Sequence, residues 1–365
     1  MNKTFRDNLI TYGMVIAAYV IMQILVSTGS VSSLMQGLLV PLCTYAILAV
    51  SLNLTVGILG ELSLGHAGFM CIGAFTSAFF SKVMENTGMP SGLRFVCAIL
   101  IGALFAGLFG LLIGIPVLRL KGDYLAIVTL AFGEIIKNLV NILFVGLDEN
   151  GFHISFTNTM DLNMSDNGQV IIKGAQGITG TPHDSNFTIG IVLLLITLVI
   201  VLNLIHSRDG RAIMAIRDNT IAAESVGIHI TKYKLMAFSI SAALAGVAGV
   251  LYAHNLSTLT ALPKNFGYNM SIMILVFVVL GGIGNIRGSI IASVILTLLP
   301  ELLRSLNDYR MLIYSIVLIV MMLFNWAPKC IEWREKVFNY WAPKYLEWRE
   351  KVVTRSSKSV KKGAK

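Results

Sequence analysis

The chain has 365 residues, of which 55% are hydrophobic and 13% are charged. A soluble globular protein carries about 25% charged residues, so this composition excludes an ordinary soluble domain and indicates a protein of membrane spans and short loops. The net charge of +9 does not point to nucleic acid, because the basic residues gather at the ends of apolar runs and in the C-terminal tail.

Apolar runs predict an all-α fold, a polytopic bundle of about ten membrane spans in which some helices are broken. If the N-terminus lies in the cytoplasm, most of the 28 Lys and Arg fall on the inner side, so we expect both termini to be cytoplasmic. The transmembrane domain would cover residues 1–326. The predicted spans are 9–27, 34–56, 62–80, 93–117, 124–146, 188–206, 233–253, 269–286, 288–304 and 310–326.

Where the second span gives way to the third, the stretch LNLTVGILGELSLGHAGFMCIGAF (52–75) is rich in glycine. Glycine at this density breaks helices or lets them pack closely, and a broken helix is tolerated at membrane depth where it lines a cavity. His66 lies within this stretch. A single histidine of this kind is more often a hydrogen-bonded packing residue than a ligand.

The fifth span carries two opposite charges near its middle, Glu134 and Lys137. Their i,i+3 spacing lets them neutralise each other on one helix, and an ionisable group at this depth is expected to face protein or a water-filled cavity. Glu134, Asn138 and Asn141 also share one face of the helix. This polar stripe is either a packing contact between helices or the lining of a pathway.

Two connections are longer than a turn. Residues 147–187, the outer loop, are rich in Asp, Asn, Gly and Thr and would form either a solvated loop or a contact with an external partner. Residues 207–232, the inner loop, contain a predicted helix from Arg211 to Ser225 with a left-handed cap at Gly227. This helix would either dock into a cytoplasmic partner or lie on lipid headgroups. Its apolar residues at helical spacing are Ile213, Ile216 and Ala223, and its polar residues are Arg217, Asp218 and Glu224.

Near the C-terminus, VLGGIGNIRGSIIASV (279–294) predicts a tight hairpin. At the start of the tail, residues 327–365, the motif WAPKCIEWREKVFNY (326–340) is followed by the near-copy WAPKYLEWREKVVTR (341–355). Trp beside Lys and Arg is typical of the membrane interface. We therefore expect a duplicated, basic, interfacial tail on the cytoplasmic side.

Sequence motifs for catalysis are absent. The chain has no G-x-x-x-x-G-K-[ST] phosphate loop, no H-E-x-x-H or G-x-S-x-G motif and no Cys/His cluster. We therefore expect neither an enzyme nor a metal site, and any dependence on ATP would come from another subunit.

Four segments in this order resemble the branched-chain amino acid ABC transporter permeases of the LivM type, from about residue 38 to residue 323. The most specific are GDYLAIVTLAFGEI (122–135) and GRAIMAIRDNTIAAESVGI (210–228). The resemblance implies a subunit of a prokaryotic inner-membrane importer of leucine, isoleucine and valine. It would work by alternating access with a second related permease, two cytoplasmic ATPases and an external solute-binding protein. The chain itself would bind no cofactor, and ATP and Mg would be held by the partner subunits.

The same resemblance implies two sets of functional residues. Coupling to the ATPase would use Gly210, Arg211, Arg217, Asp218, Ala222, Ala223, Glu224 and Gly227, while the translocation pathway would use Gly57, Gly60, Glu61, Gly65, His66, Gly68, Asp123, Thr129 and Glu134.

Two alternatives remain open from the sequence. One is a permease of related architecture for urea, short amides or sugars, because the apolar spans hold no residue that decides the solute. The other is an ion-coupled secondary transporter, for which Glu61, His66 and Glu134 are the only plausible relay residues. Transport that depends on ATP would indicate an ATP-driven permease, whereas transport that depends on an ion gradient would indicate the secondary transporter.

Overall fold

The computed structural model describes residues 3–29, 32–120, 122–148, 151–162, 164–165, 168–304 and 309–326. The chain divides into a large unit, residues 1–298, and a C-terminal unit, residues 299–365. The duplicated tail predicted over 327–365 lies outside the described residues.

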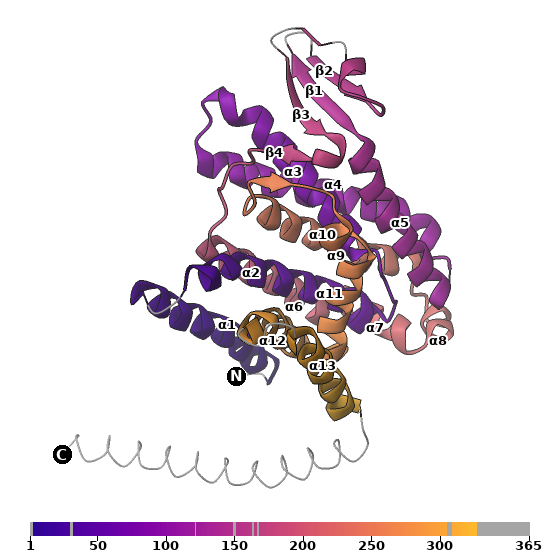
Figure 1. Ribbon diagram of the computed structural model, residues 1–365. Helices are drawn as coiled ribbons and strands as arrows, with labels where there is room; N and C mark the ends of the chain where they lie inside the picture. The colour runs from indigo at the N-terminus through magenta and orange to yellow at the C-terminus, as the bar shows by residue number, and fades with distance from the viewer. Residues whose placement is uncertain are drawn as a thin grey trace, which may run out of the picture. The chain divides into compact units, whose positions relative to one another are not determined.

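The predicted spans all form helices (Figure 1), and within the described residues seven helices are long and apolar enough to cross a membrane. The long helices are α1 (Lys3–Ser27), α2 (Ser33–Asn53), α3 (His66–Val83), α4 (Ser91–Val117), α5 (Asp123–Ile142), α6 (Phe187–His206), α9 (Ile230–Ala253), α11 (Tyr268–Gly281), α12 (Ile286–Leu302) and α13 (Arg310–Trp326), and the short ones are α7 (Arg208–Asp218), α8 (Thr220–Ser225) and α10 (Pro263–Phe266).

Helix α2 is the most deeply buried of the candidate spans. It begins at a serine cap, where the Ser32 hydroxyl accepts a hydrogen bond from the amide of Met35 at 3.4 Å. It runs directly into a π-helical turn, Leu54–Leu59, which ends at Gly60 in the left-handed region (φ +81°). Residues 60–65 then form no regular secondary structure before α3 begins. Residues 54–65 are called the broken segment below, and they confirm the prediction of a broken helix.

The core of the large unit is the packing of α3 and α4 against α9, made close by small residues. At Gly73 of α3 an added Cβ would lie 2.5 Å from Cα of Gly246 in α9, so the two backbones touch. Gly102 of α4 packs against both of these glycines. Small residues that let backbones approach closely are the usual means of association between helices in a membrane.

The outer loop is more ordered than a solvated loop. It supplies four strands of a five-stranded antiparallel sheet, in the order β2-β1-β3-β4-β5, at one end of the large unit (Figure 1). The predicted span 124–146 therefore ended too late, because α5 stops at Ile142 and the chain becomes extended. The strands are β1 (Phe144–Asp148), β2 (Gly151–Ser155), β3 (Gln169–Lys173), β4 (Ile178–Thr179) and β5 (Thr258–Leu259).

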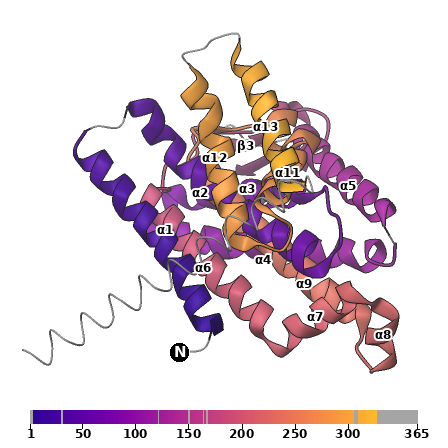
Figure 2. The same ribbon diagram turned by 90° about the horizontal axis from the view of Figure 1, so that it is seen from below.

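The inner loop holds two helices where one was predicted. Asn219 separates α7 from α8 in an extended conformation (φ −157°). Its side-chain oxygen accepts a hydrogen bond from the amide of Ala222 at 3.0 Å and so caps α8. Asparagine favours such caps over helix interiors. The predicted left-handed cap at Gly227 is confirmed (φ +84°), and Figure 2 shows α6 running into α7 with α8 beside it.

The predicted hairpin over 279–294 is confirmed. Helix α11 ends at Gly281 and α12 begins at Ile286, so only four residues connect them. An added Cβ at Gly281 would meet the backbone of Gly288, which explains why glycine stands on both sides of the turn.

We expect Gly73→Ala to lower the free energy of unfolding by about 1–3 kcal/mol, because the added methyl group overpacks the contact with α9. Thermal unfolding of the purified protein in detergent measures this. Gly37→Ala in α2 is the matched control, since an added Cβ there meets nothing within 4 Å. It should be neutral or stabilising. Equal effects of the two substitutions would contradict the close packing of α3 on α9.

Candidate functional site

A cavity of about 1230 Å³ lies between the broken segment and the inner loop. Two parts of the chain that are far apart in sequence form its walls, together with residues around Arg119 in the connection between α4 and α5. It joins Gly60 and Glu61 of the expected pathway with four residues of the expected coupling set. Those four are Arg217, Asp218, Glu224 and Gly227.

The broken segment loses regular helical hydrogen bonds, and the rest of the protein replaces them. The amides of Gly60 and Glu61 both bond to the carbonyl of Thr55 and close the π-helical turn. Further along, the amide of Leu64 donates to the Thr129 hydroxyl at 3.0 Å. The amide of Ala67, in the first turn of α3, donates to the Ser271 hydroxyl at 3.1 Å. Side chains from α5 and α11 therefore satisfy the start of α3, as a membrane-embedded backbone requires.

The inner loop and the start of α9 each form one polar contact with the broken segment. Nη1 of Arg217 donates to the carbonyl of Gly57 at 3.0 Å. Nζ of Lys234, in α9, forms an ion pair with Glu61. Lys234 reads in the sequence as an ordinary basic residue at a span end, because its partner lies 173 residues away.

Three of the other expected pathway residues, Gly65, Gly68 and Thr129, lie at a close contact between the start of α3 and α5. An added Cβ at Gly65 would overlap the backbone of Thr129, and one at Gly68 would lie 2.7 Å from Cα of Gly133. His66 is buried and hydrogen-bonded to Ser51 at 2.7 Å, which agrees with a packing role. Asp123 is the first residue of α5.

The polar stripe predicted on α5 is only partly turned toward protein. Glu134 forms the predicted ion pair with Lys137, whose side chain is 8% exposed. Glu134 also accepts a hydrogen bond of 2.7 Å from the amide of Tyr268, at the start of α11. Asn141 donates to the carbonyl of Ala261 at 3.0 Å, whereas Asn138 is exposed. A carboxylate at a helix N-terminus is favourable, because amide groups there lack partners.

The residues expected to couple the chain to a partner divide into buried and exposed sets. Ile213, Ile216 and Ala223 are buried, as their spacing predicted, so Ala223 holds the inner loop against the bundle. Gly210 is buried too, where an added Cβ would overlap the end of α6. The exposed members of the set are Arg211, Arg217, Asp218, Ala222, Glu224 and Gly227.

Two exposed apolar residues of the inner loop were not predicted as functional. Ile221 is 81% exposed and Val226 is 75% exposed, one near each end of α8. The sequence contains little indication of their exposure, because both residues fit the apolar pattern of a single amphipathic helix. Their exposure depends on the break at Asn219, which changes the direction of the chain at α8. Both side chains are open to contact with another molecule.

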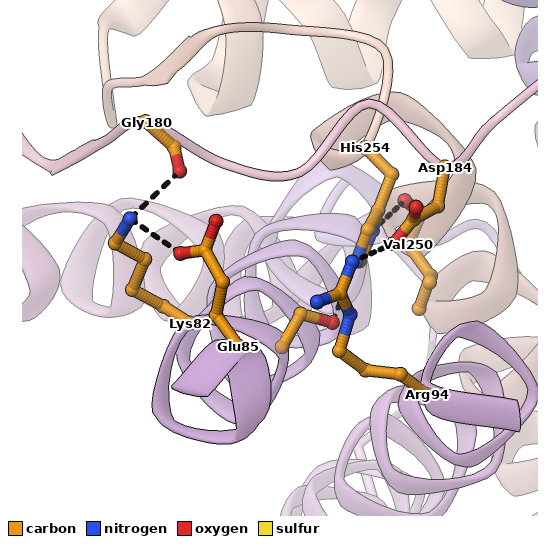
Figure 3. Close-up of polar contacts among 8 residues, drawn as sticks. Lys82, Glu85, Arg94, Gly180, Asp184, Val250 and His254 are labelled. Carbon is orange, nitrogen blue, oxygen red and sulfur yellow. Dashed lines mark hydrogen bonds and ion pairs between the residues drawn. The ribbon is translucent and has the colours of Figure 1, made fainter. Parts of the chain in front are cut away.

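At the other end of the large unit, charged residues hold the outer loop to the helices. Arg94 of α4 forms an ion pair of 2.8 Å with Asp184, and Lys82 of α3 donates to the carbonyl of Gly180 at 3.1 Å. Figure 3 shows both cations reaching toward the segment that holds Gly180 and Asp184. His254, just after α9, is hydrogen-bonded to Ser81. Burial lowers the pKa of His254 below its ordinary value, so this histidine is neutral at pH 7.

Potential metal ligands do not gather in the described part of the chain: no three His, Cys, Asp or Glu side chains lie close enough together there to hold an ion. Four of the charged groups that line the cavity form opposite pairs, Glu61 with Lys234 and Arg217 with Asp218, and Arg119 and Glu224 line it as well. Such a cavity can admit a polar solute or change shape, and it holds no constellation for covalent chemistry.

Comparison with known proteins gives a consistent result. Residues 34–324 match the family model described as branched-chain amino acid transport system / permease component. The chain is 36% identical over 294 residues to the high-affinity branched-chain amino acid transport system permease protein LivM of Salmonella typhimurium, which covers 78% of this chain and 67% of the relative.

Two more distant relatives are also transport permeases. The chain is 25% identical over 287 residues to the permease protein LivH of the same kind of system in Escherichia coli, covering 77% of this chain and 89% of the relative. It is 26% identical over 264 residues to the fructose import permease protein FruG of Bifidobacterium longum, covering 70% and 71%. No solved structure matches the chain.

We expect Glu134→Leu to destabilise the protein by about 3–5 kcal/mol, because it leaves Lys137 buried without its partner. The double variant Glu134→Leu with Lys137→Met removes both charges and should recover most of that loss. Size-exclusion chromatography and thermal unfolding in detergent compare the two. A double variant as poorly folded as the single one would contradict the ion-pair argument.

Proposed function

The chain belongs to the family of branched-chain amino acid transport system permease components, and from this membership we propose that it is a membrane subunit of an ATP-driven importer of leucine, isoleucine and valine. The single observation that carries the mechanism is the cavity that the inner loop shares with the broken segment. In this proposal both termini and the inner loop lie in the cytoplasm of a prokaryotic cell, and the sheet lies outside.

The proposed partners follow from the relatives and from the surface of the chain. Relatives named LivM and LivH occur as permease proteins of one kind of transport system, which supports pairing of this chain with a second, related permease. Two cytoplasmic ATPases would hold ATP and Mg, since this sequence has no phosphate loop. An external solute-binding protein would deliver the solute to the sheet side. The chain itself would catalyse no reaction.

The inner loop favours a protein partner over lipid headgroups at α8, whose six residues include no Lys or Arg. Its buried apolar residues, Ile213 and Ile216, face the bundle and are not available to lipid. Its exposed apolar residues, Ile221 and Val226, flank the acidic Glu224. An amphipathic helix that lies on a membrane carries Lys and Arg on its polar face, whereas an acidic residue is repelled by anionic lipids.

The ion-coupled alternative loses support from the contacts of its three relay residues. Glu61 is paired with Lys234, Glu134 is paired with Lys137, and His66 is hydrogen-bonded to Ser51. Ion relays use groups that exchange charge along a water-filled path. These three groups have fixed partners, which favours energy supplied by ATP hydrolysis elsewhere.

In this mechanism the ATPases press on the inner loop when they close on ATP. The loop moves the broken segment, and the bundle changes between access from outside and access from inside. The two conformations would be biased by solute on one side and by ATP on the other. Gly57, Gly60, Glu61, Gly65, Gly68, Thr129 and Glu134 would line or shape the route.

The first test is uptake of labelled leucine, isoleucine and valine by cells with and without the gene, in a host without another system for them. We expect gene-dependent uptake that ATP depletion abolishes and ionophores leave intact. Uptake that follows an ion gradient would contradict the proposed energy source. Uptake of fructose in place of the amino acids would assign the substrate class of the FruG relative instead.

A second test concerns the partner surface. Ile221→Arg should abolish co-purification of the ATPase subunits with this chain, because it places a charge in a contact that excludes water. Met160→Arg is the matched control: Met160 is 89% exposed but lies in the outer loop, so the ATPases should still co-purify. Retention of the ATPases by the Ile221 variant would show that α8 is not their docking surface.

A further inference from the structure

Arg217 caps the broken end of α2. Its guanidinium donates from Nη1 to the carbonyl of Gly57, inside the π-helical turn Leu54–Leu59. A helix leaves its last carbonyls without partners, and these form the negative end of the helix dipole. A cation that donates to such a carbonyl is therefore held by both a hydrogen bond and the dipole.

The guanidinium forms hydrogen bonds through all three of its nitrogens. Its Nε and Nη2 both donate to Oδ1 of Asp218, at 3.0 and 2.9 Å, so the free Nη1 is aimed at Gly57. The stem of Arg217 lies against Gly60, where an added Cβ would be 2.5 Å from Cγ of the arginine. Gly60 thus gives the backbone its left-handed turn and makes room for the arginine stem at the same position.

The turn that Arg217 holds is attached to the rest of the bundle through Asn53. The Asn53 side chain accepts a hydrogen bond from the amide of Gly284 at 2.8 Å and donates to the hydroxyl of Ser289 at 2.8 Å. An added Cβ at Gly57 would lie 2.6 Å from Cα of Gly284, so this contact has no slack. A shift of the turn is therefore passed to the α11–α12 hairpin and is not absorbed in a void.

Lys234 attaches the start of α9 to the other side of the break, through Glu61. The stretch 218–233, which carries the exposed Ile221 and Val226, lies between Arg217 and Lys234 in the sequence. A movement of α8 would therefore reach the broken segment through two contacts, that of Arg217 with Gly57 and that of Lys234 with Glu61.

We propose that Arg217 is the residue through which the inner loop moves the broken end of α2, with Lys234 as the second attachment. The inference rests on the proposed function, because it assigns the step that links ATP hydrolysis to the pathway. Arg217 is a positioning residue: it contacts a helix carbonyl and not the solute.

The test measures ATP hydrolysis and amino acid uptake in the same liposomes, reconstituted with the full transporter. For Arg217→Ala we expect uptake to fall about tenfold or more, as loss of a charged hydrogen bond allows. Hydrolysis should stay within about twofold of wild type and the partner subunits should remain bound, because the variant spares the exposed apolar residues of α8. The number of solutes moved per ATP therefore falls, which a purely structural role would not produce.

Two further variants sharpen the result. Arg208→Ala removes a charge from the same helix at an exposed position outside the proposed machinery, and its uptake per ATP should equal that of wild type. Arg217→Lys should give an intermediate ratio, because an ammonium group can reach one acceptor but cannot reproduce the planar fork that holds Gly57 and Asp218 together.

An uptake-to-hydrolysis ratio of wild-type size in Arg217→Ala would overturn the inference, and so would uptake and hydrolysis falling together in an assembled transporter. If the alanine variant does not assemble, the lysine variant decides, and an unchanged ratio overturns the inference. Uptake by the wild-type protein that does not depend on ATP would instead overturn the proposed function. ATP-dependent wild-type uptake with a fully coupled Arg217→Ala would overturn this inference alone.

Discussion

A backbone that leaves helical geometry inside a membrane needs hydrogen-bond partners from elsewhere in the protein, because lipid supplies none. The break between α2 and α3 meets this requirement with side chains from three different elements. The Thr129 hydroxyl of α5 accepts from an amide of the broken segment, and the Ser271 hydroxyl of α11 accepts from an amide of α3. Arg217 of α7 donates to the carbonyl of Gly57 in the broken segment. The break is therefore the point at which otherwise separate helices become dependent on one another.

The same constraint accounts for the charges that lie at membrane depth. Helix α11 begins beside the middle of α5, where its amides have no helical partner, and Glu134 accepts from the first of them. Once a carboxylate is placed there, its own charge needs compensation, and Lys137 one turn away supplies it. The ion pair is thus a consequence of where α11 starts, and its two charges need not act on the solute to be required.

The sequence predicted the elements that depend on local pattern and missed those that depend on distant partners. Apolar runs fixed the long helices within a few residues, and helical spacing identified Ile213 and Ile216 as buried. The sheet was missed because β5 comes from residues 258–259, far from the outer loop that it completes. The split at Asn219 was missed because a side-chain cap competes with helix propagation without changing the apolar pattern.

For the candidate site, the sequence indicated both walls of the cavity but not that they face each other. Glycine density marked the broken segment, and the mixture of Arg, Asp and Ile marked the inner loop. Their contact depends on Lys234 and Glu61, a pair that no spacing rule connects over 173 residues. Arg217 reads in the sequence as one of several exposed charges. Its hydrogen bond to the end of the broken helix distinguishes it from Arg211, whose guanidinium donates to the carbonyl of His206 at the end of α6.

The close packing of α3 and the cavity beside the inner loop have different mechanical consequences. Where glycine brings α3 against α5 and α9, the backbones touch and movement at one helix must carry its neighbours with it. Beside the inner loop a cavity opens, and its walls are joined there by the ion pair of Glu61 with Lys234 and by the hydrogen bond from Arg217 to Gly57. Charge pairs tolerate small changes of distance better than interlocked backbones, because Coulomb attraction falls slowly with separation whereas overlap does not. Contacts of this kind would let the inner loop move relative to the bundle while it stays attached to the broken segment.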